Sequence, residues 1–183
     1  MNKVLFVTGH HGVGKTHLVN SLKSEFDIQH FDTGPIIREL FSRSDCSSIE
    51  KWTEVGEEQY GKDFTNQVLC EEMAIRGIDY SRSIVITGNR SLNGIKYNST
   101  YFGVSSPNII YLDASFALLK QNYEAREKIS LSSIEFARIL DKEIAQGLNQ
   151  LKGYVLDNKD DCLYNYKHGN EDSAFSLVKK RFF

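Results

Sequence analysis

The sequence predicts a three-layer α/β domain in which helices cover both faces of a five-stranded parallel sheet. Five short apolar runs lack the polar alternation of half-exposed strands, as is typical of parallel strands buried on both faces. Helical segments lie between these runs and favour right-handed parallel crossovers, and a glycine-rich segment directly follows the first run. We predict strands over residues 4–8, 27–31, 83–87, 108–113 and 154–157.

The segments around these strands are expected to be helical. One helix follows the first strand, three helices separate the second strand from the third, and a long helical region follows the fourth. We predict helices over residues 15–25, 34–44, 48–60, 63–77, 115–128, 132–152 and 175–182.

Length and composition indicate a single globular domain. The 183 residues match the usual size of one domain, and the 40% hydrophobic content argues against disorder. A formal net charge of −2 gives no general attraction to nucleic acid or to an anionic membrane. The three cysteines fit no disulfide or zinc pattern, and no apolar run is long enough to span a bilayer. We therefore expect a cytoplasmic monomer or weak dimer that binds neither nucleic acid nor membranes.

The strongest functional signal is a phosphate-binding loop. It fits the pattern G-x-x-x-x-G-K-[ST] and lies between a predicted strand and a predicted helix. Its residues are Gly9, His10, His11, Gly12, Val13, Gly14, Lys15 and Thr16. Glycines let backbone N–H groups and the helix N-terminus approach a phosphate closely. Lys15 is expected to reach the β- and γ-phosphates, and the Thr16 hydroxyl to hold Mg²⁺. The motif predicts a P-loop NTPase fold.

Two histidines, His10 and His11, occupy variable positions of this loop. Together with His17 they suggest a metal site, but no carboxylate or cysteine nearby in the sequence completes a ligand set. We therefore expect the loop to use their backbone groups, with side chains that are incidental.

Two arginines follow predicted strands. Arg38 lies one turn into the helix that follows Asp32, and Arg90 lies just beyond Thr87. Because ligands bind beyond the carboxyl ends of parallel strands, both guanidinium groups are expected near the phosphate loop. Two guanidinium groups in that place suggest that a second phosphate is clamped.

In this order, the motifs resemble the P-loop nucleoside monophosphate kinases, such as adenylate and cytidylate kinases, and the related dephospho-CoA kinases. The resemblance lies in the phosphate loop, in Thr33-Gly34-x-x-x-Arg38, in Ile86-Thr87-Gly88-Asn89-Arg90, and in Asp141-Lys142-Glu143 followed by Gly147. It covers nearly all of residues 1–183 as one kinase domain, and it implies a five-stranded sheet with strand order 2-3-1-4-5. It implies an acceptor-binding insert over about 33–82 and a short helical lid over about 120–138.

The resemblance implies that the γ-phosphate of ATP, with Mg²⁺, is transferred to a nucleoside or deoxynucleoside monophosphate. Arg38 and Arg90 would hold the acceptor phosphate, and the lid residues Arg126 and Arg138 would neutralise charge on the transferred group. The alternative for Arg126 and Arg138 is an ordinary exposed helix charge, and it explains Arg138 as well as the lid role does. Asp32 would orient a magnesium-bound water, contact the acceptor sugar or act as a base, unless it only stabilises a helix N-terminus.

One departure from the resembling kinases concerns magnesium. They usually carry Asp where this chain has Thr87, and Asp32 is the nearest carboxylate that could replace it. The turn that ends at Arg90 is also one residue shorter than in adenylate kinases, so AMP specificity is not implied.

Two other functions stay open. A dephospho-CoA-type small-molecule kinase would need Asp32 as a base for a hydroxyl acceptor. A nucleotide-binding switch without an acceptor is the second alternative. Residues 158–161 fit the N-K-x-D motif of GTPases, but no D-x-x-G follows the third predicted strand. An acidic turn after the fifth predicted strand, at the rim of the donor base pocket, is the better interpretation.

Overall fold

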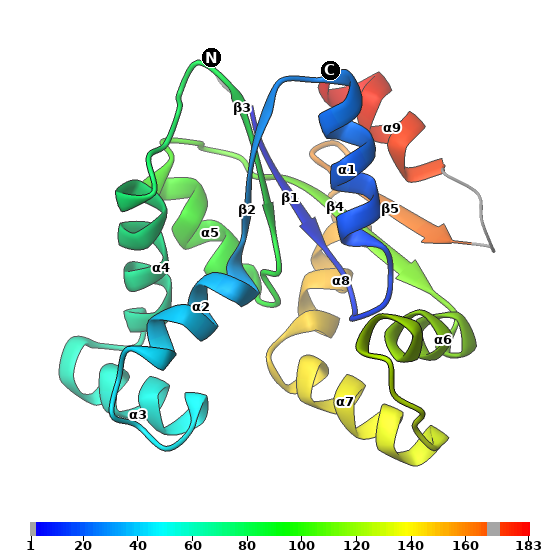
Figure 1. Ribbon diagram of the computed structural model, residues 1–183. Coiled ribbons are helices and arrows are strands. Elements are labelled where there is room, and N and C mark those ends of the chain that lie inside the picture. Colours follow the sequence, from blue (N-terminus) through cyan, green and yellow to red (C-terminus); the bar gives the residue numbers. More distant parts are fainter. Residues whose placement is uncertain (1–2, 168–172) are drawn as a thin grey trace.

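The computed structural model describes residues 3–167 and 173–183. Within these residues, parallel strands form a single sheet in the order β2-β3-β1-β4-β5, as predicted from the sequence. The strands are β1 (Val4–Thr8), β2 (Ile28–Asp32), β3 (Ser83–Thr87), β4 (Asn108–Ala114) and β5 (Cys162–Lys167). Because all pairs are parallel, the carboxyl ends lie at one end of the sheet, toward which the arrowheads point in Figure 1.

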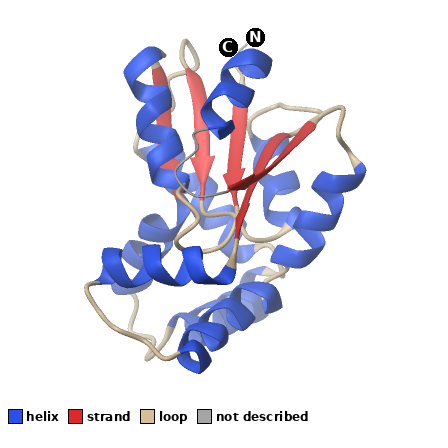
Figure 2. Ribbon diagram, turned by 90° about the vertical axis from the view of Figure 1, so that its right-hand side faces the viewer, coloured by secondary structure: helices blue, strands red, loops and turns tan. Residues whose placement is uncertain are grey.

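Helices cover both faces of the sheet (Figures 1 and 2). One buried cluster joins the sheet to α1 (Lys15–Glu25), α6 (Phe116–Glu127), α7 (Ser133–Ala145) and α9 (Ser173–Phe182). The other joins it to α2 (Thr33–Ser42), α4 (Phe64–Ile75), α5 (Leu92–Tyr101) and α8 (Leu148–Asp157). The remaining helix, α3 (Ile49–Tyr60), packs on α2 and α4.

The central strand shows why its sequence has no polar alternation. All five residues of β1 are buried, and alternate side chains enter opposite cores. Phe6 packs in the cluster beneath α4, α5 and α8, whereas Val7 packs in the cluster beneath α1 and α9. Burying such a side chain contributes roughly 1.5–3 kcal/mol, so both faces need an apolar residue.

Three helices lie between β2 and β3, as predicted. Within this segment, which contains α2, α3 and α4, the ring of Phe64 lies 5.1 Å from that of Trp52 and 5.7 Å from that of Tyr60. A Cβ on Gly56 would lie 2.1 Å from the Phe64 ring, so glycine is needed for α3 to approach α4.

The predicted fifth strand is wrong. Residues 154–157 end helix α8, and β5 begins only at Cys162. Leu148, Leu151 and Val155 face the core at helical spacing, so the apolar run belongs to one face of a helix. Residues 158–161 therefore precede β5 and lie at the amino-terminal end of the strands, whereas the phosphate loop lies at their carboxyl end. Their predicted place at the rim of the donor base pocket is wrong for the same reason.

Two helices also differ from the prediction. The single helix predicted over 132–152 is divided into α7 and α8 at Gly147, whose φ is +106°. Helix α5 was not predicted, because its sequence is rich in Asn, Ser, Thr and Gly. Its packing explains it, since Ile95 is fully buried and Asn98 accepts a hydrogen bond from the Cys70 thiol.

Across residues 3–167 and 173–183, every helix is too short or too polar to cross a membrane.

Candidate functional site: a glycine-rich loop and its buried carboxylate

The phosphate loop connects the end of β1 to the start of α1, at the carboxyl edge of the sheet (Figure 1). Gly9, Gly12 and Gly14 all have positive φ, a conformation that glycine adopts without strain. A Cβ on Gly9 would lie 2.1 Å from the backbone oxygen of Leu112, and one on Gly12 would lie 2.4 Å from that of Leu119. The motif glycines therefore fit the loop tightly between β4 and α6.

Helix α6 supports the loop from behind. Asn122 Nδ2 donates a hydrogen bond of 2.8 Å to the backbone oxygen of Gly12. The Tyr123 ring meets the His11 ring edge-on, with centroids 5.8 Å apart. These contacts fix the loop in its curved shape, which leaves less conformational entropy to lose when an anion binds.

The side chain of Lys15 folds over the loop. Its Nζ donates to the backbone oxygens of Gly9 at 2.7 Å and His10 at 2.9 Å. Burial lowers the pKa of Lys15 to about 8; the charge of Glu143 opposes this shift, and that of Arg90 adds to it. The charge of Asp32 also raises the pKa of Lys15 and that of Arg126 also lowers it, both more weakly. The site thus gathers charges of both signs around one lysine.

Glu143 of α7 reaches into the site and is 2% exposed. Its Oε2 accepts from the backbone N–H of His11 at 3.1 Å and lies 3.1 Å from His10 Nδ1. Its Oε1 lies 2.8 Å from His11 Nδ1 and 3.2 Å from Arg90 Nε, at ion-pair distance but without hydrogen-bond geometry. One buried carboxylate therefore joins α7, the phosphate loop and the segment after β3.

The environment keeps this carboxylate charged. Burial alone raises the pKa of Glu143, but contacts with His10 and His11 outweigh it and hold the pKa well below its usual range. The prediction that the His10 and His11 side chains are incidental is wrong. The carboxylate that the local sequence lacks comes from α7. Among residues 3–167 and 173–183, no group of three His, Cys, Asp or Glu side chains could hold a metal ion.

Arg90 lies beside the phosphate loop, as predicted. Besides its contact with Glu143, its Nη1 donates to Gln146 Oε1 at 2.8 Å, and its Nη2 lies 3.0 Å from His11 Nε2. Its side chain is 32% exposed. The guanidinium is thus anchored on one side and open to solvent on the other.

Asp32 and Arg38 flank the start of α2. Asp32 caps the helix by accepting from the backbone N–H of Gly34 at 3.2 Å. A Cβ on Gly34 would lie 3.6 Å from Asp32 Oδ1 and 3.4 Å from Arg38 Nη1, so both side chains approach this turn. The described contacts do not join Arg38 to Arg90, and the predicted convergence of the two arginines is not seen directly.

Thr87 pairs with Asp32 in the register of β2 and β3. Its hydroxyl lies 3.0 Å from His30 Nε2, and burial lowers the pKa of that imidazole. Thr16 is exposed in the first turn of α1. Because Asp32 pairs with Thr87, its carboxylate lies next to Thr87 at the carboxyl end of the strands.

The two arginines predicted for a lid, Arg126 and Arg138, differ in position. The Arg126 guanidinium lies 5.3 Å from the centroid of the Tyr123 ring, contacts Glu127 and is close enough to influence Lys15. Arg138 is exposed on α7, where its charge acts on Glu135. The structure brings Arg126 near the loop and gives Arg138 no contact with it among the described residues.

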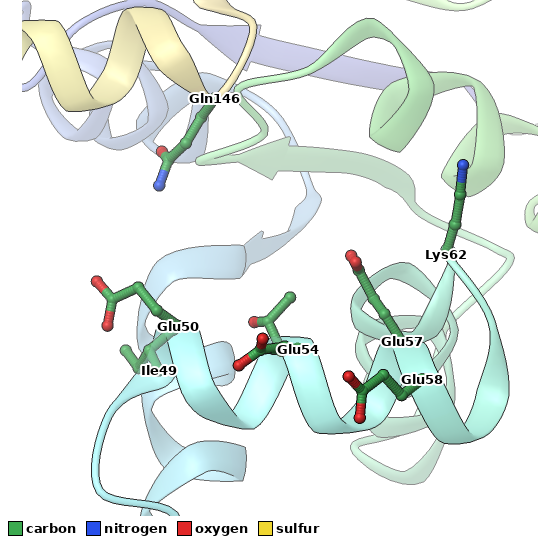
Figure 3. A pocket seen from close by; sticks show the side chains of 8 residues that line it. Ile49, Glu50, Glu54, Glu57, Glu58, Lys62 and Gln146 are labelled. Carbon is green, nitrogen blue, oxygen red and sulfur yellow. The ribbon is translucent and has the colours of Figure 1, made fainter.

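A pocket of about 590 Å³ opens between α3 and the end of α7 (Figure 3). Gln146 faces α3 across it, and α3 presents a row of glutamates. The polar residues that line it include Glu50, Glu54, Glu57, Glu58, Lys62 and Gln146. Since Gln146 accepts a hydrogen bond from Arg90, this pocket adjoins the loop of residues 9–16 and its neighbour Arg90.

Sequence reasoning quoted Glu143 only as part of a resemblance and assigned it no role. One signal was available. Phe136, Ile139, Leu140 and Glu143 follow the spacing of a core-facing helical stripe, in which a carboxylate is out of place. Gln146 carried no comparable signal.

Comparisons with known proteins give no family assignment. No protein-family model matches this chain, and no curated protein matches it.

Proposed function

We propose that this protein is an ATP-dependent phosphotransferase of the P-loop nucleoside monophosphate kinase type. It would move the γ-phosphate of ATP to a nucleoside or deoxynucleoside monophosphate. The observation that carries the proposal is the phosphate loop at the end of the central strand, with Lys15 folded over it and Arg90 beside it. A cytoplasmic location and a monomeric or weakly dimeric state belong to the same proposal.

The donor side uses the loop itself. Its backbone N–H groups and the N-terminus of α1 would bind the phosphates of ATP. Lys15 now caps two loop carbonyls, and its ammonium group would turn toward the β- and γ-phosphates when they bind. Arg126, at the end of α6, would neutralise charge on the transferred group, and Arg138 would need lid closure to contribute.

The acceptor side uses the ends of β2 and β3. Arg90 and Arg38 would hold the acceptor phosphate so that one of its oxygens attacks the γ-phosphorus. The bond to the bridging oxygen breaks, and ADP leaves. The glutamates of α3 would repel a phosphate from the floor of the adjoining pocket (Figure 3). The acceptor phosphate is therefore expected at the Gln146 end, next to Arg90.

Thr16 and Asp32 would hold Mg²⁺ together with the nucleotide. Mg²⁺ typically keeps several waters and takes one or two protein oxygens together with substrate phosphates. The Thr16 hydroxyl and the Asp32 carboxylate are oxygen ligands of this kind. When bound, the ion would neutralise charge between the β- and γ-phosphates.

The test is the release of ADP from ATP·Mg²⁺ in the presence of each ribo- and deoxynucleoside monophosphate and of dephospho-CoA. The Lys15→Ala variant provides the blank. Stimulation by one or more monophosphates supports the proposal and names the acceptor. Stimulation only by dephospho-CoA would replace it with a hydroxyl-acceptor kinase. Tight nucleotide binding without stimulation by any acceptor would favour a switch.

A further inference from the structure

Side chains from the phosphate loop and from the segment after β3 meet the Glu143 carboxylate of α7, and these side chains differ in their exposure to solvent. The side chain of Glu143 is 3% exposed and that of His10 is 11% exposed, whereas His11 is 29% and Arg90 is 32% exposed. Glu143 therefore lies behind the surface of the site. His11 and Arg90 form the layer that a bound nucleotide would meet.

An apolar side chain would suit the position of Glu143 in α7. Glu143 takes the place of an apolar residue in the stripe formed by Phe136, Ile139 and Leu140. A buried carboxylate loses its hydration, and replacing a buried charge network with apolar side chains is often neutral or stabilising. Packing alone therefore gives no reason for a carboxylate here.

The two carboxylate oxygens make different contacts. Oε2 accepts the backbone N–H of His11, which fixes the phosphate loop to α7. Oε1 lies near His11 Nδ1 and Arg90 Nε. With this edge of Arg90 held, its Nη groups extend toward Gln146 and His11, on the exposed side of the network.

We propose that Glu143 is a positioning residue of the phosphate site, which fixes the loop at His11 and holds Arg90 in place for phosphate. Because it is buried, it acts through these two residues. The inference rests on the proposed function, since it assigns the site to nucleotide phosphates.

Charge and position predict opposite results at this residue. Glu143 is a negative charge close to Lys15. If it acted only through its charge, Glu143→Gln would tighten ATP·Mg²⁺ binding, and Glu143→Asp would leave it unchanged. If it positions the loop and Arg90, both variants weaken binding. Glu143→Asp keeps the charge and withdraws the carboxylate by one methylene, so it separates the two roles.

The experiment is calorimetric titration of ATP·Mg²⁺ into the wild type and both variants, with thermal unfolding as a check of folding. We expect Kd to rise about tenfold or more in each variant. Asp141→Asn removes a charge from the exposed face of the same helix and should change Kd by less than about twofold. The double variant Glu143→Gln with Arg90→Lys should lose less binding free energy for ATP·Mg²⁺ than the sum of the losses in the two single variants, because the two residues act together.

Several results would overturn the inference: tighter binding by Glu143→Gln, wild-type binding by Glu143→Asp, or strict additivity with Arg90→Lys. If the Glu143 variants do not fold, His11→Ala tests the hold on Arg90, because alanine keeps the backbone N–H but removes the imidazole that contacts both Glu143 and Arg90. It should weaken binding by about threefold or more, and unchanged binding would contradict the proposal. Failure of the proposed function is a separate result, in which the wild type itself binds no ATP·Mg²⁺.

Discussion

Replacing Gly12 with alanine should push the phosphate loop away from α6. The new Cβ would lie 2.4 Å from the backbone oxygen of Leu119 and 3.2 Å from the backbone nitrogen of Tyr123. Neither atom can rotate out of the way. Loop and helix would have to separate by about 0.6 Å before the shorter distance reached 3.0 Å, below which real Cβ contacts essentially never occur.

The magnitude follows from two contributions. A non-glycine residue at the Gly12 φ of +79° costs roughly 1–2 kcal/mol. A separation of this size would stretch the 2.8 Å hydrogen bond from Asn122 to about 3.4 Å, which loses up to about 1 kcal/mol. The expected loss in the free energy of unfolding is therefore up to about 2–3 kcal/mol. Gly77 provides the matched control, because its φ is +85° and a Cβ there would meet nothing within 4 Å. Gly77→Ala should lose only about 1–2 kcal/mol.

Urea unfolding of both variants measures these losses, and titration with ATP·Mg²⁺ measures the effect on the site. We expect Gly12→Ala to weaken nucleotide binding by about tenfold or more, because a displacement of this size disrupts phosphate contacts. Gly77→Ala should bind like the wild type. Equal stability losses in the two variants, or wild-type binding by Gly12→Ala, would refute the claim that α6 shapes the loop.

Three further predictions concern other parts of the molecule. Gly56→Ala should destabilise the protein by up to about 2 kcal/mol, because the clash of the new Cβ with Phe64 exceeds the gain in helix propensity. Gly153→Ala has open space around its Cβ and should stabilise the protein by up to about 1 kcal/mol, and thermal unfolding that shifted both variants in the same direction would contradict this. Titration of Lys15, whose pKa is lowered to about 8, should weaken ATP binding as pH rises above about 8. Between pH 8 and 10.5 Lys15 keeps its proton in the unfolded chain and loses it in the folded chain, so its contribution to the free energy of unfolding should rise with pH. ATP binding that stayed constant above pH 8 would argue against a role for the Lys15 ammonium group. Ser132→Ala removes the N-cap of α7 and should cost about 0.5–2 kcal/mol in urea unfolding, and an unchanged midpoint would show that the capping box is dispensable.

The sequence predicts most of the sheet and the place of the glycine-rich loop well because both depend on local patterns. Strands β1 and β3 are continuous apolar runs, and the loop follows β1 directly. The edge strand β5 shows the limit of such patterns. Several of its side chains are only half-buried, so it lacks a continuous apolar run, and the apolar end of α8 was mistaken for it.

The candidate site is less predictable because its central contact is long-range. Glu143 lies more than 130 residues from His10 and His11 in the sequence. No local motif links an acidic residue on α7 to a glycine-rich loop. The only sequence feature that singles out Glu143 is its place in an apolar helical stripe, and this feature does not indicate which residues it contacts. The arginines were found more easily, since Arg38 and Arg90 follow strand ends.

The most direct measurement would follow the phosphate itself. Wild-type protein would be incubated with Mg²⁺, the nucleoside monophosphates and ATP that carries an isotopic label on its γ-phosphate, and the products would be identified by mass spectrometry. The proposed function predicts that the label appears on the β-phosphate of a nucleoside diphosphate, and that the Lys15→Ala variant forms none. Label found only in inorganic phosphate, or on a hydroxyl group of another acceptor, would contradict a nucleoside monophosphate kinase.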